Sequence, residues 1–310
     1  MRTAPIVIVA LFAASAAEAF GTVNVGRQSA EHEKITRLAF TCAGAAGDAC
    51  FQPETLDQLA GRKGTFGAIG YPDSSYAVFQ SKAHCDNGDF LPTPGYPRTS
   101  AQAEASLASC RDWMAHNLDE AVEDAARLLG EDGRVRRSQV SMFVGCVWAF
   151  NVKGRAKCNV LQDMGILMHA AQDFYAHSNW VDRGGGGGAG DPPGLGRTGP
   201  APWISLRGPV SFPEGLISGC FSLEASACEG RVMHATLNKD TGPIGADIGP
   251  GTTPRGAGPA GNFKAAVEAA VADTVDKWAL LRERLVARYG PDRGSRMICA
   301  LTRDDPVKDC

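Results

Sequence analysis

The segment that decides the fold runs from residue 165 to residue 182 and reads Gly-Ile-Leu-Met-His-Ala-Ala-Gln-Asp-Phe-Tyr-Ala-His-Ser-Asn-Trp-Val-Asp. Its polar residues His169, Asp173 and His177 are spaced by four. On an α-helix a step of four residues turns only about 40° further around the axis and rises about 6 Å, so the three side chains share one face. A carboxylate between two imidazoles at this spacing can bridge two metal ions, each also held by one histidine. The segment therefore predicts a helix that carries a metal site.

A structural alternative exists for the same helix. Ile166, Ala170 and Phe174 form an apolar stripe that would pack against the core. A solvated polar face on the opposite side would account for one histidine and one aspartate without any metal. Two histidines and an aspartate in strict register favour the metal site.

The first residues have the pattern of a secretory signal peptide. Arg2 provides a positive charge, residues 6–12 are apolar, and Ala17-Glu18-Ala19 matches an A-x-A cleavage pattern. The apolar run is too short to cross a bilayer. We therefore expect a signal peptide at residues 1–19 and an exported, extracellular or periplasmic chain that forms a single domain over residues 20–310.

The ten cysteines agree with export, because disulfides persist in oxidising compartments. Short loops close most readily, which favours pairing in sequential order. Zinc–thiolate clusters are the alternative, and the absence of a C-x-x-C motif makes them less favoured. The expected pairs are Cys42–Cys50, Cys85–Cys110, Cys146–Cys158, Cys220–Cys228 and Cys299–Cys310.

Apolar residues recur at helical spacing in several other segments, and no segment alternates with period two over a useful length. The sequence therefore predicts an all-α fold, with long loops rich in Gly and Pro at residues 184–202 and 242–261. The expected helices beside the central one cover residues 29–41, 100–129, 138–150 and 262–289. Ser29 is a candidate N-cap for the first of these helices, and either Thr99 or Ser100 can cap the long helix that follows.

Further candidate metal ligands lie outside the central segment. Taken alone, each has a simpler explanation: His32 is a surface residue in a first helical turn, and Asp73, Asp86 and Asp89 are turn residues. His116 is interpreted as an ordinary surface histidine. The candidates that remain are His32, Asp73, His84, His234 and Asp240.

Together these residues resemble those of the secreted zinc-dependent phospholipases C and single-strand-specific zinc nucleases. Members of that superfamily are helical proteins with three zinc ions in a cleft. The phrase His-Ala-Ala-Gln-Asp-Phe-Tyr-Ala-His-Ser-Asn-Trp at residues 169–180 is closer still to the heterokaryon-incompatibility C (HET-C) proteins and the CinY-like secreted bacterial proteins. The CinY-like resemblance covers nearly the whole mature chain, including residues 31–37, 84–87, 237–240 and 297–306.

The resemblance implies three groups of zinc ligands, with Asp173 as the carboxylate that bridges two of them. The groups are His169, Asp173, Asp73 and His84 for the first ion, His177, His234 and Asp240 for the second, and His32 with the main chain of Phe20 for the third. Asp73 or Asp173 would orient the attacking water as a catalytic residue. The chain departs from the family's H-x-x-x-D/E pattern, because Asn238 stands four residues after His234. The spacing from Asp173 to His177 is also shorter than in either enzyme group.

This ligand set implies a secreted, zinc-dependent phosphodiester hydrolase of the phospholipase C type, with two or three zinc ions. Calcium is less favoured, because the EF-hand spacing is absent. The net charge of −3 and the lack of Lys/Arg runs argue against a nucleic-acid surface. The expected substrate is a phosphodiester such as a phospholipid at a membrane surface.

Three alternatives stay open. A single-strand nuclease would use the same ligands and stack bases on Trp180 or Trp203. A metal-stabilised extracellular interaction protein would hold its ions in closed coordination without turnover. A serine or cysteine hydrolase is least favoured, because no G-x-S-x-G motif is present and every cysteine has a disulfide partner to pair with. Nothing in the sequence indicates the oligomeric state.

Overall fold

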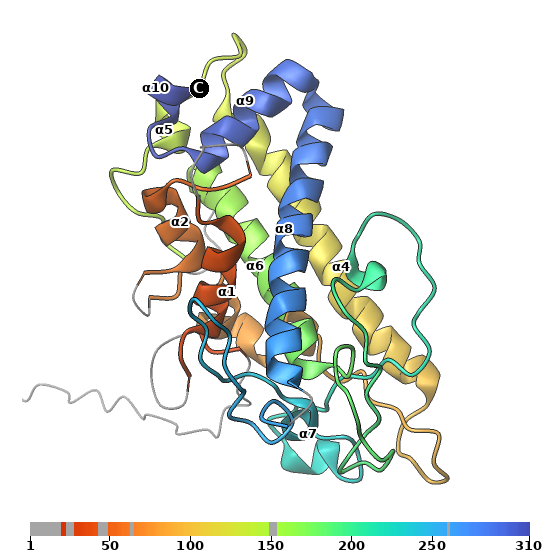
Figure 1. Cartoon of the computed structure of the whole chain (residues 1–310). Coiled ribbons are helices and arrows are strands. Elements are labelled where there is room, and N and C mark those ends of the chain that lie inside the picture. The colour runs from red at the N-terminus through yellow and green to blue at the C-terminus, as the bar shows by residue number, and fades with distance from the viewer. Residues whose placement is uncertain (1–19, 23–27, 43–48, 63–64, 149–153, 259–260) are drawn as a thin grey trace, which may run out of the picture.

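The computed structural model describes residues 20–22, 28–42, 49–62, 65–148, 154–258 and 261–310 of the chain. Over these residues it contains ten α-helices, a few short 3-10 turns and isolated β-bridges, but no β-strand (Figure 1). The expectation of an all-α protein is confirmed. The expected signal peptide at residues 1–19 lies outside the described residues.

Helix α6 (Ala156–His177) is the centre of the fold, and all 22 of its residues are buried. It packs against α4 (Ser100–Ala125) and α8 (Asn262–Tyr289), and α1 (Glu31–Phe40) packs against α8 (Figure 1). A helix buried on every side has no solvated face. The alternative in which the polar residues of this helix face water is therefore excluded, and each of them needs a partner inside the protein.

The ends of the long helices follow from local sequence. Thr99 begins α4 with a capping box: its hydroxyl accepts a hydrogen bond from the Gln102 N–H, and the Gln102 side chain accepts one from the Thr99 N–H. Gly290, with φ of 81°, ends α8, and Pro291 starts the next helix, α9 (Pro291–Thr302). The expected helix at 262–289 is confirmed; the one expected at 100–129 ends at Ala125 and continues as a 3-10 turn to Leu128.

The remaining helices are short. They are α2 (Pro53–Ala60), α3 (Tyr71–Ser74), α5 (Arg137–Val140), α7 (His234–Leu237) and α10 (Pro306–Asp309). Five helices of the fold were not expected from the sequence, namely α9 and the short helices α2, α3, α7 and α10. All of these except α7 have a proline in the first turn, where the missing N–H costs nothing.

The expected helix at residues 138–150 is wrong over most of its length. Only α5 is helical there, and residues 141–148 form an irregular segment. The Arg155 guanidinium donates hydrogen bonds to the carbonyl oxygens of Ser141, Val144 and Gly145, which in a continuing helix would bond along its own axis. Long-range contacts therefore override the helical pattern of this segment.

The central helix also ends earlier than the quoted segment. After His177 the chain becomes extended at Ser178, with φ of −100° and ψ of 165°. The Asn179 N–H then bonds to the Ile217 carbonyl at 3.0 Å, and Ser178 pairs with Ser218. The polar residues after His177 thus belong to a bridge with a distant loop.

All five expected disulfides are present, in sequential order. Two of them hold segments against the core. Cys85–Cys110 joins the loop after His84 to α4, and Cys146–Cys158 joins the irregular segment to the first turn of α6. The disulfides therefore fix loops whose own sequences specify little regular structure.

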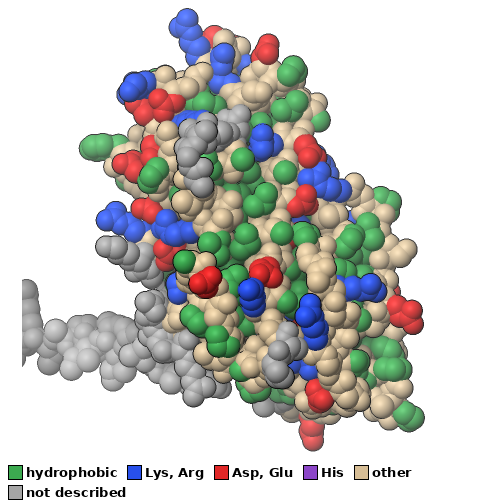
Figure 2. Space-filling model, viewed as in Figure 1, with side chains coloured by type: hydrophobic (Ala, Val, Ile, Leu, Met, Phe, Trp, Pro, Cys, Tyr) green, Lys and Arg blue, Asp and Glu red, His purple; other side chains and the backbone are tan. Residues whose placement is uncertain are grey.

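The visible surface is mixed in charge. Figure 2 shows positive and negative side chains interspersed over this face of the molecule. No helix within the described ranges is both long enough and apolar enough to cross a membrane.

Gly165 allows a close approach that the metal centre requires. A Cβ atom at this position would lie only 2.4 Å from the carbonyl carbon of Ala68. The loop before α3 can therefore lie directly on α6. The Ile69 carbonyl in this loop is 2.9 Å from Nδ1 of His169, one turn further along the helix.

Lys157 anchors the start of α6 to the rest of the fold. Its side chain is fully buried, and Nζ donates to the Thr55 hydroxyl at 3.0 Å and to the Arg303 carbonyl. Burial lowers the pKa of Lys157 to about 7, against the opposing charges of Asp304 and Glu54. A buried ammonium is thus tolerated through hydrogen bonds to neutral acceptors.

We expect Lys157→Met to flatten the dependence of stability on pH. The folded pKa of about 7 lies below the usual value of 10.5, so at this lysine the unfolded chain binds more protons between these values, and Lys157 contributes a rise in the free energy of unfolding with pH. Urea unfolding at about pH 7 and about pH 9 measures this rise. The variant should lose it, whereas Lys308→Met, at an exposed position, should keep it. An equal rise in both variants would contradict the assignment.

Candidate metal centre

Histidine and aspartate side chains from five parts of the chain converge at one end of α6. Three groups among the described residues have ligand atoms close enough together to hold a metal ion. Their side chains are buried, and the most exposed is Asp73, at 18%. The converging side chains are His32, Asp73, His84, Asp86, His169, Asp173, His177, His234 and Asp240.

Asp173 lies between the groups and presents one oxygen to each side. Its Oδ2 is 3.0 Å from Nε2 of His169 and 2.8 Å from Nδ1 of His84. Its Oδ1 is 3.1 Å from Nε2 of His32 and 3.9 Å from Nε2 of His177. This is the placement that a bridging carboxylate requires, as the spacing along the helix indicated.

The first group combines Asp73, His84 and His169 with Oδ2 of Asp173. Nε2 of His169 lies 3.5 Å from Asp73 Oδ1 and 3.2 Å from Nδ1 of His84. Nδ1 of His169 faces the Ile69 carbonyl and therefore carries the proton, which leaves the lone pair on Nε2 for a metal. The structure thus brings together the four residues expected for the first ion.

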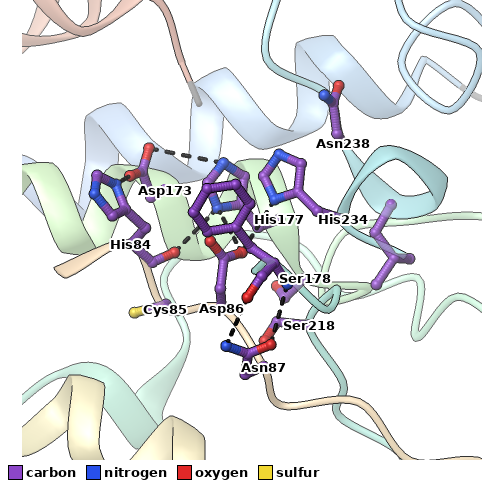
Figure 3. Close-up of polar contacts among 12 residues, drawn as sticks. His84, Cys85, Asp86, Asn87, Asp173, His177, Ser178, Ser218, His234 and Asn238 are labelled. Atoms are coloured by element: carbon purple, nitrogen blue, oxygen red, sulfur yellow. Dashed lines mark hydrogen bonds and ion pairs between the residues drawn. The ribbon is translucent and has the colours of Figure 1, made fainter. Parts of the chain in front are cut away.

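In the second group, His177 and His234 lie between two carboxylates, Asp86 and Asp240. Figure 3 shows the two rings beside Asp86. Their Nδ1 atoms are 3.2 and 3.1 Å from Asp86 Oδ1. Their Nε2 atoms are 3.2 and 3.5 Å from the oxygens of Asp240. Nδ1 of His177 is also 3.0 Å from the carbonyl oxygen of His84, so this nitrogen carries the proton. Asp86, His177 and His234 could hold a metal ion together. Because Nδ1 of His177 carries a proton, we favour an arrangement in which Asp86 orients the rings and the Nε2 atoms and Asp240 are the donors.

The departure from the H-x-x-x-D/E pattern is explained by the end of α7. This helix stops at Leu237, so Asn238 does not return to the face of His234. Its side chain instead accepts a hydrogen bond from the Asp240 N–H at 3.4 Å, and Figure 3 shows it apart from the histidine pair. The chain then turns, and Asp240 supplies the carboxylate.

The third group is His32 with Oδ1 of Asp173. Gln172 fixes the His32 ring: its Oε1 lies 2.7 Å from Nδ1, and its amide group donates to the hydroxyls of Thr36 and Thr274. Nδ1 of His32 is therefore the proton donor, and Nε2 faces Asp173. The interpretation of His32 as a surface residue is wrong, because its side chain is fully buried.

Phe20 lies beside His32, with ring centroids 5.8 Å apart. The buried carboxylate of Glu31 holds the segment beside Phe20 in place by accepting hydrogen bonds from the N–H groups of Gly21 and Ser29. Ser29 is not the helix cap that the sequence indicated; α1 begins after Ala30 without a side-chain cap. The structure places Phe20 near the third group, and its role as a main-chain ligand stays a prediction.

Asp86 is the site residue that the sequence analysis missed, because it was interpreted as a turn residue. It lies between two residues with positive φ, Cys85 at 54° and Asn87 at 66°. Cys85 is held by its disulfide to α4, and the Asn87 side chain forms two hydrogen bonds with the main chain of Phe221. The only local sign in the sequence that Asp86 belongs to the site was its position two residues after His84. Asp89, also interpreted as a turn residue, instead forms buried ion pairs.

His116 lies apart from this centre, exposed on α4, as expected. When the candidate ligands are considered together, His116 is the one histidine that the sequence assigns to the surface. Five of the six histidines of the chain therefore belong to the centre.

Charges inside the centre shift the pKa values of its members. Burial would raise the pKa of Asp173, but the charges of three neighbouring histidines outweigh it and hold the pKa well below its usual value. Burial would lower the pKa of His177, but the surrounding carboxylates raise it well above its usual value. Asp86 and Asp240 likewise raise the pKa of His234 to about 9, against burial and the charge of His177.

The donor atoms are arranged to fit metal ions. Nε2 of His32 and His177, Oδ1 of Asp173 and both oxygens of Asp240 have no hydrogen-bond partner in the described part of the chain. Yet these atoms lie close together, with 3.1 Å between His32 and Asp173 and 3.2 Å between His177 and Asp240. In each pair the nitrogen and the oxygen lie close together without the geometry of a hydrogen bond. Their lone pairs can therefore be directed at a common point, where a cation could bind. Each unsatisfied buried group costs about 1–3 kcal/mol, which a bound cation would offset.

We expect metal binding to release protons, because His177 and His234 hold protons at neutral pH in the metal-free protein. The apparent metal affinity should therefore rise between about pH 6 and about pH 9. Calorimetric titration of the metal-free protein with zinc, in buffers of different ionisation enthalpy, measures the number of protons released. An affinity and a proton count that do not change with pH would contradict the assignment.

Asp86→Asn should weaken the binding of one metal ion about 10–100-fold, because it removes the carboxylate that orients His177 and His234. Competition with a chelator measures the affinity of each ion. Asp247→Asn, an exposed aspartate, is the matched control and should leave all affinities unchanged. Equal affinities in the two variants would show that Asp86 does not support the second group.

A scan against models of protein families found no match, and searches of curated proteins and of solved structures found no similar protein. The function of this chain is therefore inferred from its own side chains and their geometry.

Proposed function

We propose that this protein is a secreted, zinc-dependent hydrolase of phosphodiesters, similar in type to phospholipase C. One observation carries the proposal: the two oxygens of the buried Asp173 carboxylate face two separate sets of histidines. A carboxylate shared in this way is a feature of multi-metal hydrolytic sites. The signal-peptide pattern at residues 1–19 and the five disulfides support export to an oxidising compartment.

The donor set favours zinc over calcium. Five imidazoles and four carboxylates converge, whereas calcium sites are built from oxygen ligands. Imidazole nitrogen with carboxylate oxygen is a typical zinc environment. The three groups are consistent with two or three ions.

When bound, zinc would lower the pKa of a coordinated water and polarise the phosphoryl oxygens of a substrate. Among the protein's own side chains, we assign the catalytic roles to Asp73 and Asp173. Asp73 is the donor with a partly exposed side chain, and the Thr22 hydroxyl donates to its Oδ2, which keeps the carboxylate directed at the centre. Asp73 is therefore placed to accept a proton from an attacking water. Asp173 stays ionised, because its pKa is far below neutrality.

A phospholipid or another small phosphodiester suits this surface better than nucleic acid. The net charge is −3, and charges of both signs are interspersed in Figure 2. Trp180 and Trp203, which a nuclease would use for stacking, are only 6% and 5% exposed. The Trp180 ring N–H also bonds to the Gly199 carbonyl. The nuclease alternative therefore loses its expected stacking residues.

A second candidate is a metal-stabilised interaction protein without turnover. The burial of the centre favours it: apart from Asp73, no ligand side chain of the centre is more than a few per cent exposed. A structural metal site is closed by its protein ligands, whereas a hydrolase keeps one position open. Both candidates predict bound metal, and only the hydrolase predicts turnover of a substrate.

We expect the mature chain from Phe20 to contain two or three zinc ions and to hydrolyse a nitrophenyl phosphodiester reporter. Asp173→Ala should lose at least one ion and reduce turnover at least about 10³-fold, because two metal positions share this carboxylate. Elemental analysis and a reporter assay measure both. The control is Asp112→Asn, at an exposed position on α4.

Each outcome decides between the candidates. Metal without turnover on reporter, phospholipid or nucleic acid would favour the interaction protein. A wild-type chain without bound metal would overturn both candidates.

A further inference from the structure

We propose that Lys239 is a positioning residue that holds Asp240 against His177 and so builds the second metal group. The inference rests on the proposed metal centre and concerns a residue that is not itself a ligand. Its basis is a buried network of charges next to the centre, formed by Lys239, Asp182 and Arg255.

The Lys239 ammonium is fully buried and is compensated by three oxygen atoms. Nζ donates hydrogen bonds to the carbonyl oxygens of Ser178 and Leu237, both at 2.8 Å, and forms an ion pair with Oδ1 of Asp182 at 3.0 Å. Burying a charged group without such partners is costly. These contacts therefore tie the lysine to two segments of main chain and to one buried carboxylate.

These bonds join the segment of Asp240 to the end of α6. The main-chain N–H of Lys239 bonds to the Ala176 carbonyl at 3.1 Å, and its side chain bonds to the Ser178 carbonyl. Ala176 and Ser178 flank His177 on either side. Lys239 is thus bonded to the main chain on both sides of His177, which is one proposed metal ligand. The residue that follows Lys239 is Asp240, the second proposed ligand.

Asp240 has few contacts of its own that place it. Its carboxylate oxygens pair with Nε2 of His177 at 3.2 Å and with Nε2 of His234 at 3.5 Å, and they accept no further hydrogen bond within the described ranges. The approach of this carboxylate to the two histidines therefore depends on the main chain that carries it. Lys239, the preceding residue, bonds that main chain to the end of α6.

The network continues to the glycine-rich loop. Arg255 binds Oδ2 of Asp182 at 2.8 Å, the Pro192 carbonyl at 2.8 Å and Asp191 at 3.1 Å. Two cations and two anions alternate along this path, from the buried Lys239 to the exposed Asp191 at its outer end. The loop that follows the metal helix is therefore connected to the second metal group through Asp182 and Lys239.

The test compares Lys239→Met and the double variant Lys239→Met/Asp182→Asn with the wild type. In Lys239→Met the carboxylate of Asp182 keeps its ion pair with Arg255, so no buried charge is left unpaired. The double variant also removes the charge of Asp182, while Arg255 keeps its contacts with Asp191 and the Pro192 carbonyl. The matched control is Lys277→Met/Asp273→Asn, which removes another fully buried lysine–aspartate pair, 2.7 Å apart, within α8. Zinc content and zinc affinity are measured for each, with thermal unfolding of the metal-free proteins.

We expect the double variant to lose one zinc equivalent, or to bind one ion about 10–100-fold more weakly, while the control keeps the wild-type metal content. The metal-free double variant and control should unfold at similar temperatures. Wild-type zinc content and affinity in the double variant would overturn the positioning role. A loss of all ions together, in both the double variant and the control, would show a general structural effect and would also overturn it.

The same samples separate this inference from the proposed function. If the wild type binds zinc but turns over no phosphodiester, and the double variant loses one ion, the positioning role holds and the hydrolase is overturned. If the wild type hydrolyses the reporter and the double variant keeps all its ions, the hydrolase holds and the positioning role is overturned.

Discussion

The structure depends on the compensation of polar side chains on a central helix whose residues are all buried. Every residue of α6 is buried, and three of them are His169, Asp173 and His177. A carboxylate without solvent is costly unless opposite charges or donors surround it. Asp173 has histidines on both sides, and those histidines have carboxylates of their own. Segments far apart in sequence are thereby required to meet at this helix.

The convergence also explains features of the fold that seem unrelated to chemistry. Gly165 lets the loop before α3 lie on the helix, where the Ile69 carbonyl sets the tautomer of His169. Cys85 and Asn87 adopt positive φ values on either side of Asp86. Backbone strain of this kind persists only where surrounding contacts impose it, and here a disulfide and the bonds to Phe221 do so. The irregular loops are therefore parts of the metal centre as much as the helices are.

The features that the sequence predicts well are those with local causes. The spacing by four in α6, the capping residue Thr99 and the periodicity of residues 262–289 all act within a few residues. The sequential disulfides follow from short loops. The failures have long-range causes. Arg155 binds the carbonyl groups of an expected helix, and Asp86 reaches the centre only through contacts with α4 and Phe221. No local pattern contains those contacts.

The disulfide arrangement has a consequence for the order of events during folding. Each bridge closes a loop of 8 to 25 residues, whereas the contacts of the metal centre join residues up to 148 positions apart. Short loops close early, and contacts between distant segments form late. Each cysteine can therefore meet its partner before the tertiary structure exists, and oxidation at that early stage carries little risk of incorrect pairing. The helices can then assemble around α6 with their loops already closed.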